Sequence, residues 1–360
     1  MARPALARVD LDALRHNYRL AKRLAPGARA VAVVKANAYG HGAVAVARAL
    51  AAEADAFGVA CIEEALELRA AGVANPVLLL EGVFEASELA LAAEQRLWVV
   101  VHCAEQLQWI TQARLAAPLQ VWLKMDSGMH RVGFAPTDYR AAHAALAASP
   151  NVESLVLMTH YARADETACA ATARQREVFE AATAGLAGAR CANNSAGIMA
   201  WPAADAWIRP GMMLYGASPL DVEDGRDLQP VMTLSSALIS VRDLAAGEPV
   251  GYGGGFVTPQ AMRIGVVAMG YGDGYPRNAP AGTPVMVGGR RTRLVGRVSM
   301  DMLTLDLGGL DSPRVGDPVE LWGRHVRLAE VAAACATIPY ELVTRMPARV
   351  PRRYEGSTGP

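Results

Sequence analysis

Two patterns of apolar and polar positions divide the chain near residue 230. From about residue 10 to 215, short apolar runs alternate with alanine-rich stretches of helical periodicity, such as HGAVAVARALAAE. The apolar runs predict strands at Ala30–Val34, Ala56–Ala60, Val77–Leu80, Leu97–Val101, Gln120–Lys124, Ser154–Thr159, Arg190–Ala192 and Trp207–Arg209. Eight strands alternating with helices over ~200 residues are what a (β/α)8 barrel requires. A doubly wound open sheet alternates in the same way, so periodicity alone does not decide between them.

Beyond about Pro230, short strand-like runs are separated by clusters of turn residues such as GYGGGF, GYGDGYP and VGGRR. This pattern of short strands and turns predicts a mainly antiparallel β domain with one short helix near Leu328–Cys335. The predicted strands are Met232–Ile239, Ile264–Ala268, Val285–Val287, Leu294–Val298, Leu303–Leu307 and Val319–Trp322. The polar stretch VEDGRDLQP, residues 222–230, is the predicted linker. We therefore expect a barrel over residues 1–228, whose first residues can pair with the second domain, and a β domain over 229–360.

Composition narrows the class of protein mainly by exclusion. The chain has 360 residues, is 52% hydrophobic and has zero formal net charge, so a large core is expected and a nucleic-acid partner is not. The N-terminal residues lack a secretory signal, and no apolar run reaches the ~18 residues that a membrane helix needs. Five scattered cysteines without a CxxC pair fit reduced thiols. We expect a cytoplasmic protein without a metal site and without membrane contact.

Polar side chains stand at or just beyond several predicted strand ends, where a βα barrel carries its chemistry. They are Lys35, Lys124, Arg131, His160, Asn194, Ser195 and Arg209. Any one of these is by itself more often a solvated charge or a satisfied core histidine. Their shared position on one rim predicts a functional site.

The motifs that are missing restrict the chemistry of this rim. The sequence has no HExxH, Walker A or GxSxG motif, and no GxGxxG that opens a helix after a strand. An amine, several cations and hydroxyls remain, and this set suits a phosphorylated aldehyde cofactor that forms a Schiff base with Lys35. Its phosphate would lie against the backbone N–H groups of Gly211 and Met212 and the hydroxyls of Ser195 and Tyr39.

Nine motifs in order give the sequence a family resemblance. They are VVKANAYGHG (residues 33–42), LKMDSGMHRVGF, THYARAD, NNSAG, RPGMMLYG, VGYGGGF, GYGDGYPR, GRVSMD and a late RVP. Together they resemble the bacterial alanine racemases, a fold type III family with a barrel domain and a β domain, over nearly the whole chain. The resemblance implies pyridoxal 5'-phosphate as cofactor. It also implies interconversion of L- and D-alanine, for peptidoglycan or for alanine catabolism.

The resemblance implies roles for the catalytic residues. Lys35 would hold the cofactor and act as the base on the D face of the substrate carbon. Tyr252 would act on the L face, and in the family it comes from the other subunit of a head-to-tail homodimer. His160 and Arg209 would support Tyr252. Arg209 would also face the pyridine nitrogen and, because arginine keeps its proton, leave that nitrogen unprotonated, which disfavours transamination and decarboxylation.

The family pattern assigns other residues to the substrate. Arg131 and the backbone N–H of Met300 would bind its carboxylate, and Tyr271 would narrow the entrance. Lys124 matches a lysine that can be carbamylated and then positions the neighbouring arginine. The chain departs from some family members at Ala348, where they carry a tyrosine before RVP that reaches the phosphate. The pocket is then either roomier or filled by another side chain.

Three alternatives stay open from the sequence. A racemase of broader amino-acid specificity is compatible with Ala348. A fold type III decarboxylase would place an acidic residue against the pyridine nitrogen, where this chain has Arg209. A cofactor carrier without turnover would lack the second domain and Tyr252.

Overall fold

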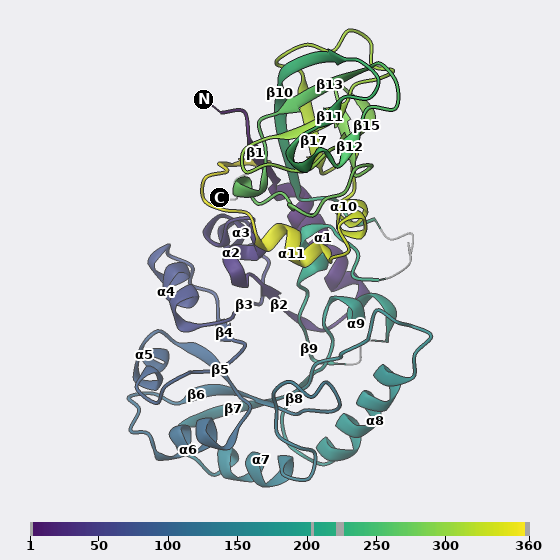
Figure 1. The fold of residues 1–360 in the computed structure, drawn as a ribbon. Helices are drawn as coiled ribbons and strands as arrows, with labels where there is room; N and C mark the ends of the chain where they lie inside the picture. Colours follow the sequence, from purple (N-terminus) through teal and green to yellow (C-terminus); the bar gives the residue numbers. More distant parts are fainter. Residues whose placement is uncertain (1–2, 203–204, 221–226, 357–360) are drawn as a thin grey trace.

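The computed structural model describes residues 3–202, 205–220 and 227–356, and it divides into a barrel and a β domain (Figure 1). Residues 222–226 of the predicted linker, which spans residues 222–230, lie outside the described residues. The predicted boundary between residues 228 and 229 stays a prediction.

The barrel is a sheet of eight parallel strands in the order β8-β7-β6-β5-β4-β3-β2-β9. The strands are β2 (Arg29–Val33), β3 (Ala56–Val59), β4 (Val77–Leu79), β5 (Leu97–Val101), β6 (Leu119–Lys124), β7 (Val152–Met158), β8 (Ala189–Cys191) and β9 (Trp207–Ile208). Each overlaps its predicted run. The predicted (β/α)8 fold is therefore confirmed over the open-sheet alternative.

Helices surround this sheet (Figure 1). They are α1 (Leu11–Leu24), α3 (Ala43–Leu50), α4 (Ile62–Ala70), α5 (Glu88–Glu94), α6 (Ala104–Gln112), α7 (Tyr139–Ala147), α8 (Ala171–Thr183) and α9 (Ser195–Ala200). Between β2 and α3 lies the short α2 (Lys35–Tyr39). The strands read as continuous apolar runs because one face packs on these helices and the other fills the barrel.

The barrel interior is a separate apolar cluster whose fully buried members all come from strands. Trp98, Trp122 and Trp207 meet there, with ring centroids 5.4 to 6.1 Å apart. Such a packed core closes the interior of a barrel and leaves only its rim open for chemistry.

The second domain is an eight-stranded sheet in the order β13-β16-β15-β14-β17-β10-β1-β18, which also pairs β13 with β10. Its strands are β1 (Leu6–Asp10), β10 (Met232–Leu244), β13 (Met262–Val267), β14 (Pro284–Val287), β15 (Arg290–Val295), β16 (Leu303–Asp306), β17 (Pro318–Trp322) and β18 (Arg352–Glu355). A hairpin of β11 (Pro249–Val250) and β12 (Phe256–Val257) is separate. All these pairings are antiparallel except that of β1 with β18.

The structure adds the strands β11, β12 and β18 to those predicted for this domain, and it corrects one strand end and the number of helices. The predicted strand Leu294–Val298 ends at Val295 because Gly296 takes φ = 70°, which breaks the extended backbone. The predicted helix near Leu328–Cys335 is α10 (Leu328–Ala334). A second helix, α11 (Pro339–Thr344), follows it and was not predicted. It is only six residues long and lies against α2 of the barrel (Figure 1).

Candidate active site

A cavity of about 630 Å³ is lined by residues at the carboxyl ends of the barrel strands. Its volume is in the range that holds a cofactor with a small substrate. The predicted residues that line it are Lys35, Tyr39, Lys124, Arg131, His160, Asn194, Ser195, Arg209, Gly211 and Met212. The structure thus brings the whole predicted rim together around one space.

The turn after Lys35 has an unusual backbone. Four consecutive non-glycine residues, Ala36 to Tyr39, have φ between 49° and 54°. The left-handed conformation costs roughly 1–2 kcal/mol per residue for L-amino acids. Local hydrogen bonds offset part of this cost: Ala36 N donates to Glu64 Oε1 at 2.7 Å, and Asn37 Oδ1 accepts from Ala43 N at 2.8 Å. The turn brings both Lys35 and Tyr39 to the cavity wall.

Positive charge is concentrated in this cavity. Burial, followed by the charges of Arg209, Arg131 and Lys35, lowers the pKa of Lys124 to about 8. Burial and the charge of Arg209 also hold the pKa of His160 well below its usual range. The imidazole is therefore neutral at physiological pH, and Lys124 loses its proton more readily than an ordinary lysine does.

Arg209 is held by neutral acceptors. Its Nη2 donates to the carbonyl oxygens of Thr159 at 2.7 Å and Ala192 at 3.1 Å, and it lies 3.4 Å from His160 Nδ1. Its Nη1 donates to Cys191 Sγ at 2.7 Å. Among the described residues no carboxylate pairs with this guanidinium, so its charge stays available to the cavity. Because arginine has only N–H groups, His160 Nδ1 is the acceptor in their contact.

One end of the cavity gathers the groups predicted for the phosphate. Gly211 N donates to Ser195 Oγ at 2.8 Å, and Asn194 caps α9 by accepting from Gly197 N at 3.0 Å. A methyl group added to Gly211 would lie 2.8 Å from the Tyr39 hydroxyl and 3.8 Å from Ser195 Oγ. The hydroxyls of Tyr39 and Ser195 and the backbone of Gly211 thus surround a small concave recess, the phosphate cradle. This donor set fits the phosphate of pyridoxal 5'-phosphate, and Lys35 fits its aldehyde.

Among the other lining residues, those with titratable side chains were missed by the sequence analysis: Glu81, His102 and Tyr340. Glu81 and His102 follow β4 and β5, so the rule that found Lys35 could have found them. Tyr340 lies on α11 of the second domain, and nothing in its local sequence pointed to a barrel cavity.

The other three predicted residues, Tyr252, Tyr271 and Met300, are not among the residues that line this cavity. They belong to the second domain and are 70%, 38% and 54% exposed. Tyr252 begins the short turn η2 (Tyr252–Gly254), between β11 and β12. Within one chain the predicted site is therefore split between the barrel cavity and an exposed surface.

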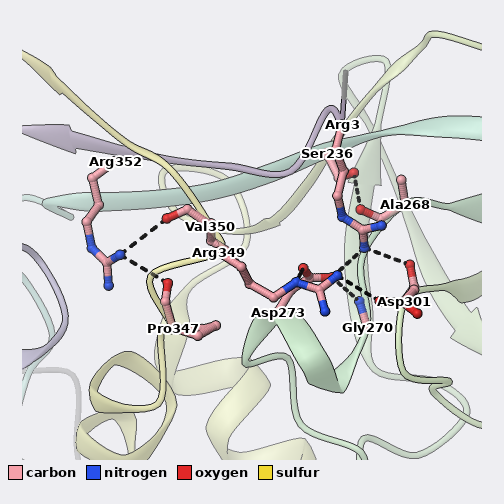
Figure 2. A network of polar contacts seen from close by, with 10 residues as sticks. All are labelled: Arg3, Ser236, Ala268, Gly270, Asp273, Asp301, Pro347, Arg349, Val350 and Arg352. Carbon is pink, nitrogen blue, oxygen red and sulfur yellow. Dashed lines mark hydrogen bonds and ion pairs between the residues drawn. The ribbon is translucent and has the colours of Figure 1, made fainter. Parts of the chain in front are cut away.

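The loops of Tyr271 and Met300 form one unit. Tyr271 N donates to Ser299 O at 3.0 Å, and Gly272 N donates to Met300 O at 2.8 Å. The buried Asp273 anchors this unit, since it pairs with Arg3 Nη2 at 2.6 Å and with Arg349 Nε at 3.0 Å (Figure 2).

A barrel that ends in an amine-bearing, cation-rich cavity, followed by an antiparallel β domain, defines a pyridoxal-phosphate-dependent amino-acid enzyme. The chain belongs to the alanine racemase family. The model of the alanine racemase N-terminal domain matches residues 9–219, and that of the C-terminal domain matches residues 231–354.

Several alanine racemases are similar to this chain over nearly its whole length. An alanine racemase of Pseudomonas taetrolens is 62% identical over 98% of this chain and 99% of its own length. A catabolic alanine racemase of Pseudomonas putida is 61% identical over the same shares of both chains. The crystal structure of a biosynthetic alanine racemase from Pseudomonas aeruginosa has a TM-score of 0.96 at 54% identity, covering 98% of this chain and 100% of that one.

These matches confirm the predicted family, fold, cofactor and isomerase reaction. Within the part of the chain that the structure describes, none of the helices is long and apolar enough to cross a membrane. The relatives include enzymes of both catabolic and biosynthetic description, so the metabolic direction is left open.

Proposed function

We propose that this chain interconverts L- and D-alanine in the cytoplasm by a two-base mechanism, as a homodimer that binds pyridoxal 5'-phosphate in the barrel cavity. The observation that carries the proposal is the convergence of Lys35, Arg209 and the Ser195–Tyr39 cradle on one cavity. When bound, the cofactor supplies the electron-withdrawing ring that makes the α-proton of the amino acid acidic.

Racemisation needs a proton acceptor and a proton donor on opposite faces of one carbon. Lys35 Nζ removes or returns the proton on the D face, and the Tyr252 phenol acts on the L face. The split site supports a dimer, because Tyr252 is exposed and outside the cavity of its own subunit. A second copy of the chain then supplies Tyr252 to each cavity, as expected for a symmetric, isologous interface.

His160 and Arg209 prepare the site for Tyr252. A phenol has a pKa near 10 and is a poor base without help. The positive charge of Arg209 and Arg131 stabilises negative charge on the phenol oxygen once Tyr252 enters the cavity. His160 accepts from Arg209 at Nδ1, and its Nε2, which lies 3.3 Å from the Asn194 side-chain nitrogen, is the ring atom that would face that phenolate.

The substrate carboxylate is held by Arg131 in the cavity and by the backbone N–H of the partner's Met300. Tyr271, on the same loop unit as Met300, narrows the entrance. Lys124 is the carbamylation site. Its pKa of about 8 leaves enough neutral amine to react with carbon dioxide, and the resulting anion is stabilised by Arg131 and Arg209.

The direct test is incubation of the purified chain with L-alanine and pyridoxal 5'-phosphate, followed by chiral measurement of D-alanine. Formation of D-alanine at a rate abolished by Lys35→Ala is the expected result. Absence of D-alanine, with carbon dioxide released from another amino acid, would favour the decarboxylase alternative. A steady-state comparison of alanine, serine and basic amino acids measures how strict the enzyme is.

A further inference from the structure

The loops at the barrel rim are joined in neighbouring pairs by side chains from the helices α4, α6, α8 and α9. Glu64 on α4 accepts from Ala36 N at 2.7 Å and Ala60 N at 2.8 Å, and so joins the loops after β2 and β3. Ser195, the first residue of α9, accepts from Gly211 N at 2.8 Å and joins the loops after β8 and β9. Each of these side chains holds two adjacent strand ends together.

Gln106 on α6 joins the loops after β4 and β5. Its Oε1 accepts from His102 N at 2.9 Å. Its Nε2 donates to the carbonyl oxygens of Glu81 and Val83, both at 3.0 Å. The residue is only 4% exposed, so these hydrogen bonds are made away from water, where a lost partner costs most.

Gln175 on α8 makes the equivalent link between the loops after β6 and β7. Its Oε1 accepts from Ala162 N at 2.9 Å. Its Nε2 donates to His160 O at 3.0 Å and to Ser127 Oγ at 3.3 Å. At 3% exposed, Gln175 is as deeply buried as Gln106. The two glutamines therefore make closely similar hydrogen bonds in similar surroundings, but between different loops.

The loops that Gln175 joins carry two residues of the proposed mechanism, Arg131 and His160. Between Ser127 and Arg131 the chain forms a compact turn, because Asp126 Oδ1 accepts from the backbone N–H groups of Gly128–His130 at 2.9 to 3.0 Å. Arg131 itself is exposed, so its position depends on how this turn is anchored. The loops that Gln106 joins carry no residue of the proposed mechanism.

The link made by Gln175 continues toward Arg209. Ser127 Oγ lies 2.7 Å from Thr159 Oγ1, and Thr159 O accepts from Arg209 Nη2 at 2.7 Å. Gln175 also packs on the turn, since a methyl group added to Gly128 would lie 3.3 Å from Gln175 Cγ. A shift of Gln175 would therefore be transmitted to both loops at once.

We propose that Gln175 is a positioning residue for racemisation, which holds Arg131 at the substrate carboxylate and His160 beside Arg209 by joining their two loops. Gln106 makes the same kind of link but has only a structural role. This inference rests on the proposed function for the roles of Arg131 and His160.

The test compares Gln175→Met with Gln106→Met, its matched control. Methionine removes the hydrogen bonds but keeps a long, unbranched side chain of similar helix propensity. Each variant leaves buried backbone groups without partners, so both should lower the melting temperature by a similar amount.

Propionate, which is alanine without its amine, probes the carboxylate site of the holoenzyme separately from turnover. Its Kd is measured by calorimetry. Gln175→Met should raise this Kd by about tenfold, the effect of one hydrogen bond to a charged group, and should raise the KM for alanine with it. Gln106→Met should keep the wild-type Kd and KM.

The pair of variants separates the possible failures. An equal loss of propionate binding in both would indicate a general loosening of the rim and would overturn the proposal. A lower melting temperature of Gln175→Met with unchanged propionate binding would overturn it as well. If Gln175→Met does not fold, Ser127→Ala takes its place, since it removes the contact of Gln175 with the loop of Arg131. A raised Kd in Ser127→Ala supports the proposal, and an unchanged Kd overturns it.

Arg131→Lys distinguishes this inference from the proposed function. A weaker affinity for propionate in Arg131→Lys confirms the carboxylate site on which the comparison of the glutamines depends. Wild-type affinity in Arg131→Lys would overturn the proposed role of Arg131, and with it the positioning role of Gln175.

Discussion

Arg209 donates a hydrogen bond to the thiol of Cys191, with 2.7 Å between Nη1 and Sγ. The thiol is fully buried, and burial raises its pKa to about 12. It therefore stays a neutral acceptor, and the arginine that faces the cofactor site keeps its full positive charge. Together with the carbonyl oxygens of Cys191, Thr159 and Ala192, the thiol holds the guanidinium in one orientation.

Cys191→Ala should lower the free energy of unfolding by about 1–3 kcal/mol, because a buried charged donor loses an acceptor. Cys191→Ser keeps an acceptor at this position and should be closer to the wild type. Chemical denaturation of the three proteins measures the difference. Equal stability of the alanine and serine variants would show that the thiol contributes only packing.

Tyr252→Phe should impair proton abstraction from L-alanine far more than from D-alanine, because the variant keeps Lys35 on the D face. Exchange of the α-proton with deuterated solvent, followed separately for each enantiomer, measures the two steps. An equal loss of both exchanges would contradict the assignment of faces.

Mixed dimers test whether Tyr252 acts across the interface. Lys35→Ala and Tyr252→Phe chains should each be nearly inactive alone. When they are unfolded together and reassembled, half of the dimers are mixed and one of their two sites is intact. About a quarter of the wild-type activity should then return. No recovery, with mixed dimers demonstrated by mass spectrometry, would place both bases in one subunit.

Lys124 should make stability depend on pH. Its pKa falls from 10.5 to about 8 on folding, so the unfolded state binds more protons between these values and stability rises as pH increases through that window. In buffer free of carbon dioxide, Lys124→Met should be more stable than the wild type below pH 8, by an amount on the order of 3 kcal/mol. The stability advantage of Lys124→Met should become smaller as the pH approaches 10.5, the pKa of the lysine in the unfolded chain. Equal pH profiles of the two proteins would contradict this.

Bicarbonate gives the matching test of carbamylation. Converting the Lys124 cation to an anion beside Arg131 and Arg209 replaces repulsion by attraction. Bicarbonate should therefore raise the melting temperature of the wild type and leave that of Lys124→Met unchanged. A ¹³C carbamate signal that depends on Lys124 would identify the modification directly.

Asp273 should control the substrate-binding loops from a distance. Asp273→Asn weakens its pairs with Arg3 and Arg349, which anchor the unit that carries Tyr271 and Met300. We expect a higher KM for alanine with a smaller change in kcat. Arg345→Met, which breaks an exposed pair with Glu341, is the control and should have little effect. A fall in kcat at constant KM would contradict a positioning role.

The sequence by itself determined the barrel, most strands of the second domain and the barrel side of the site. Alternation of strands and helices fixes which residues end each strand, and the ends of parallel strands meet at one rim. The sequence alone therefore predicts that Lys35, Lys124, His160 and Arg209 lie close together. The motifs, rather than the periodicity, connected Tyr252 with that rim.

Only the tertiary structure decided how the second domain contributes. The six-residue α11 carries too little periodicity to be predicted, and its position depends on one close approach at Gly40 and on the reach of Arg352. The left-handed turn after Lys35 is equally invisible in sequence, since it is held by side chains such as Glu64 that lie far along the chain. Local pattern fixes which residues end a strand, whereas contacts between distant segments fix what those residues meet.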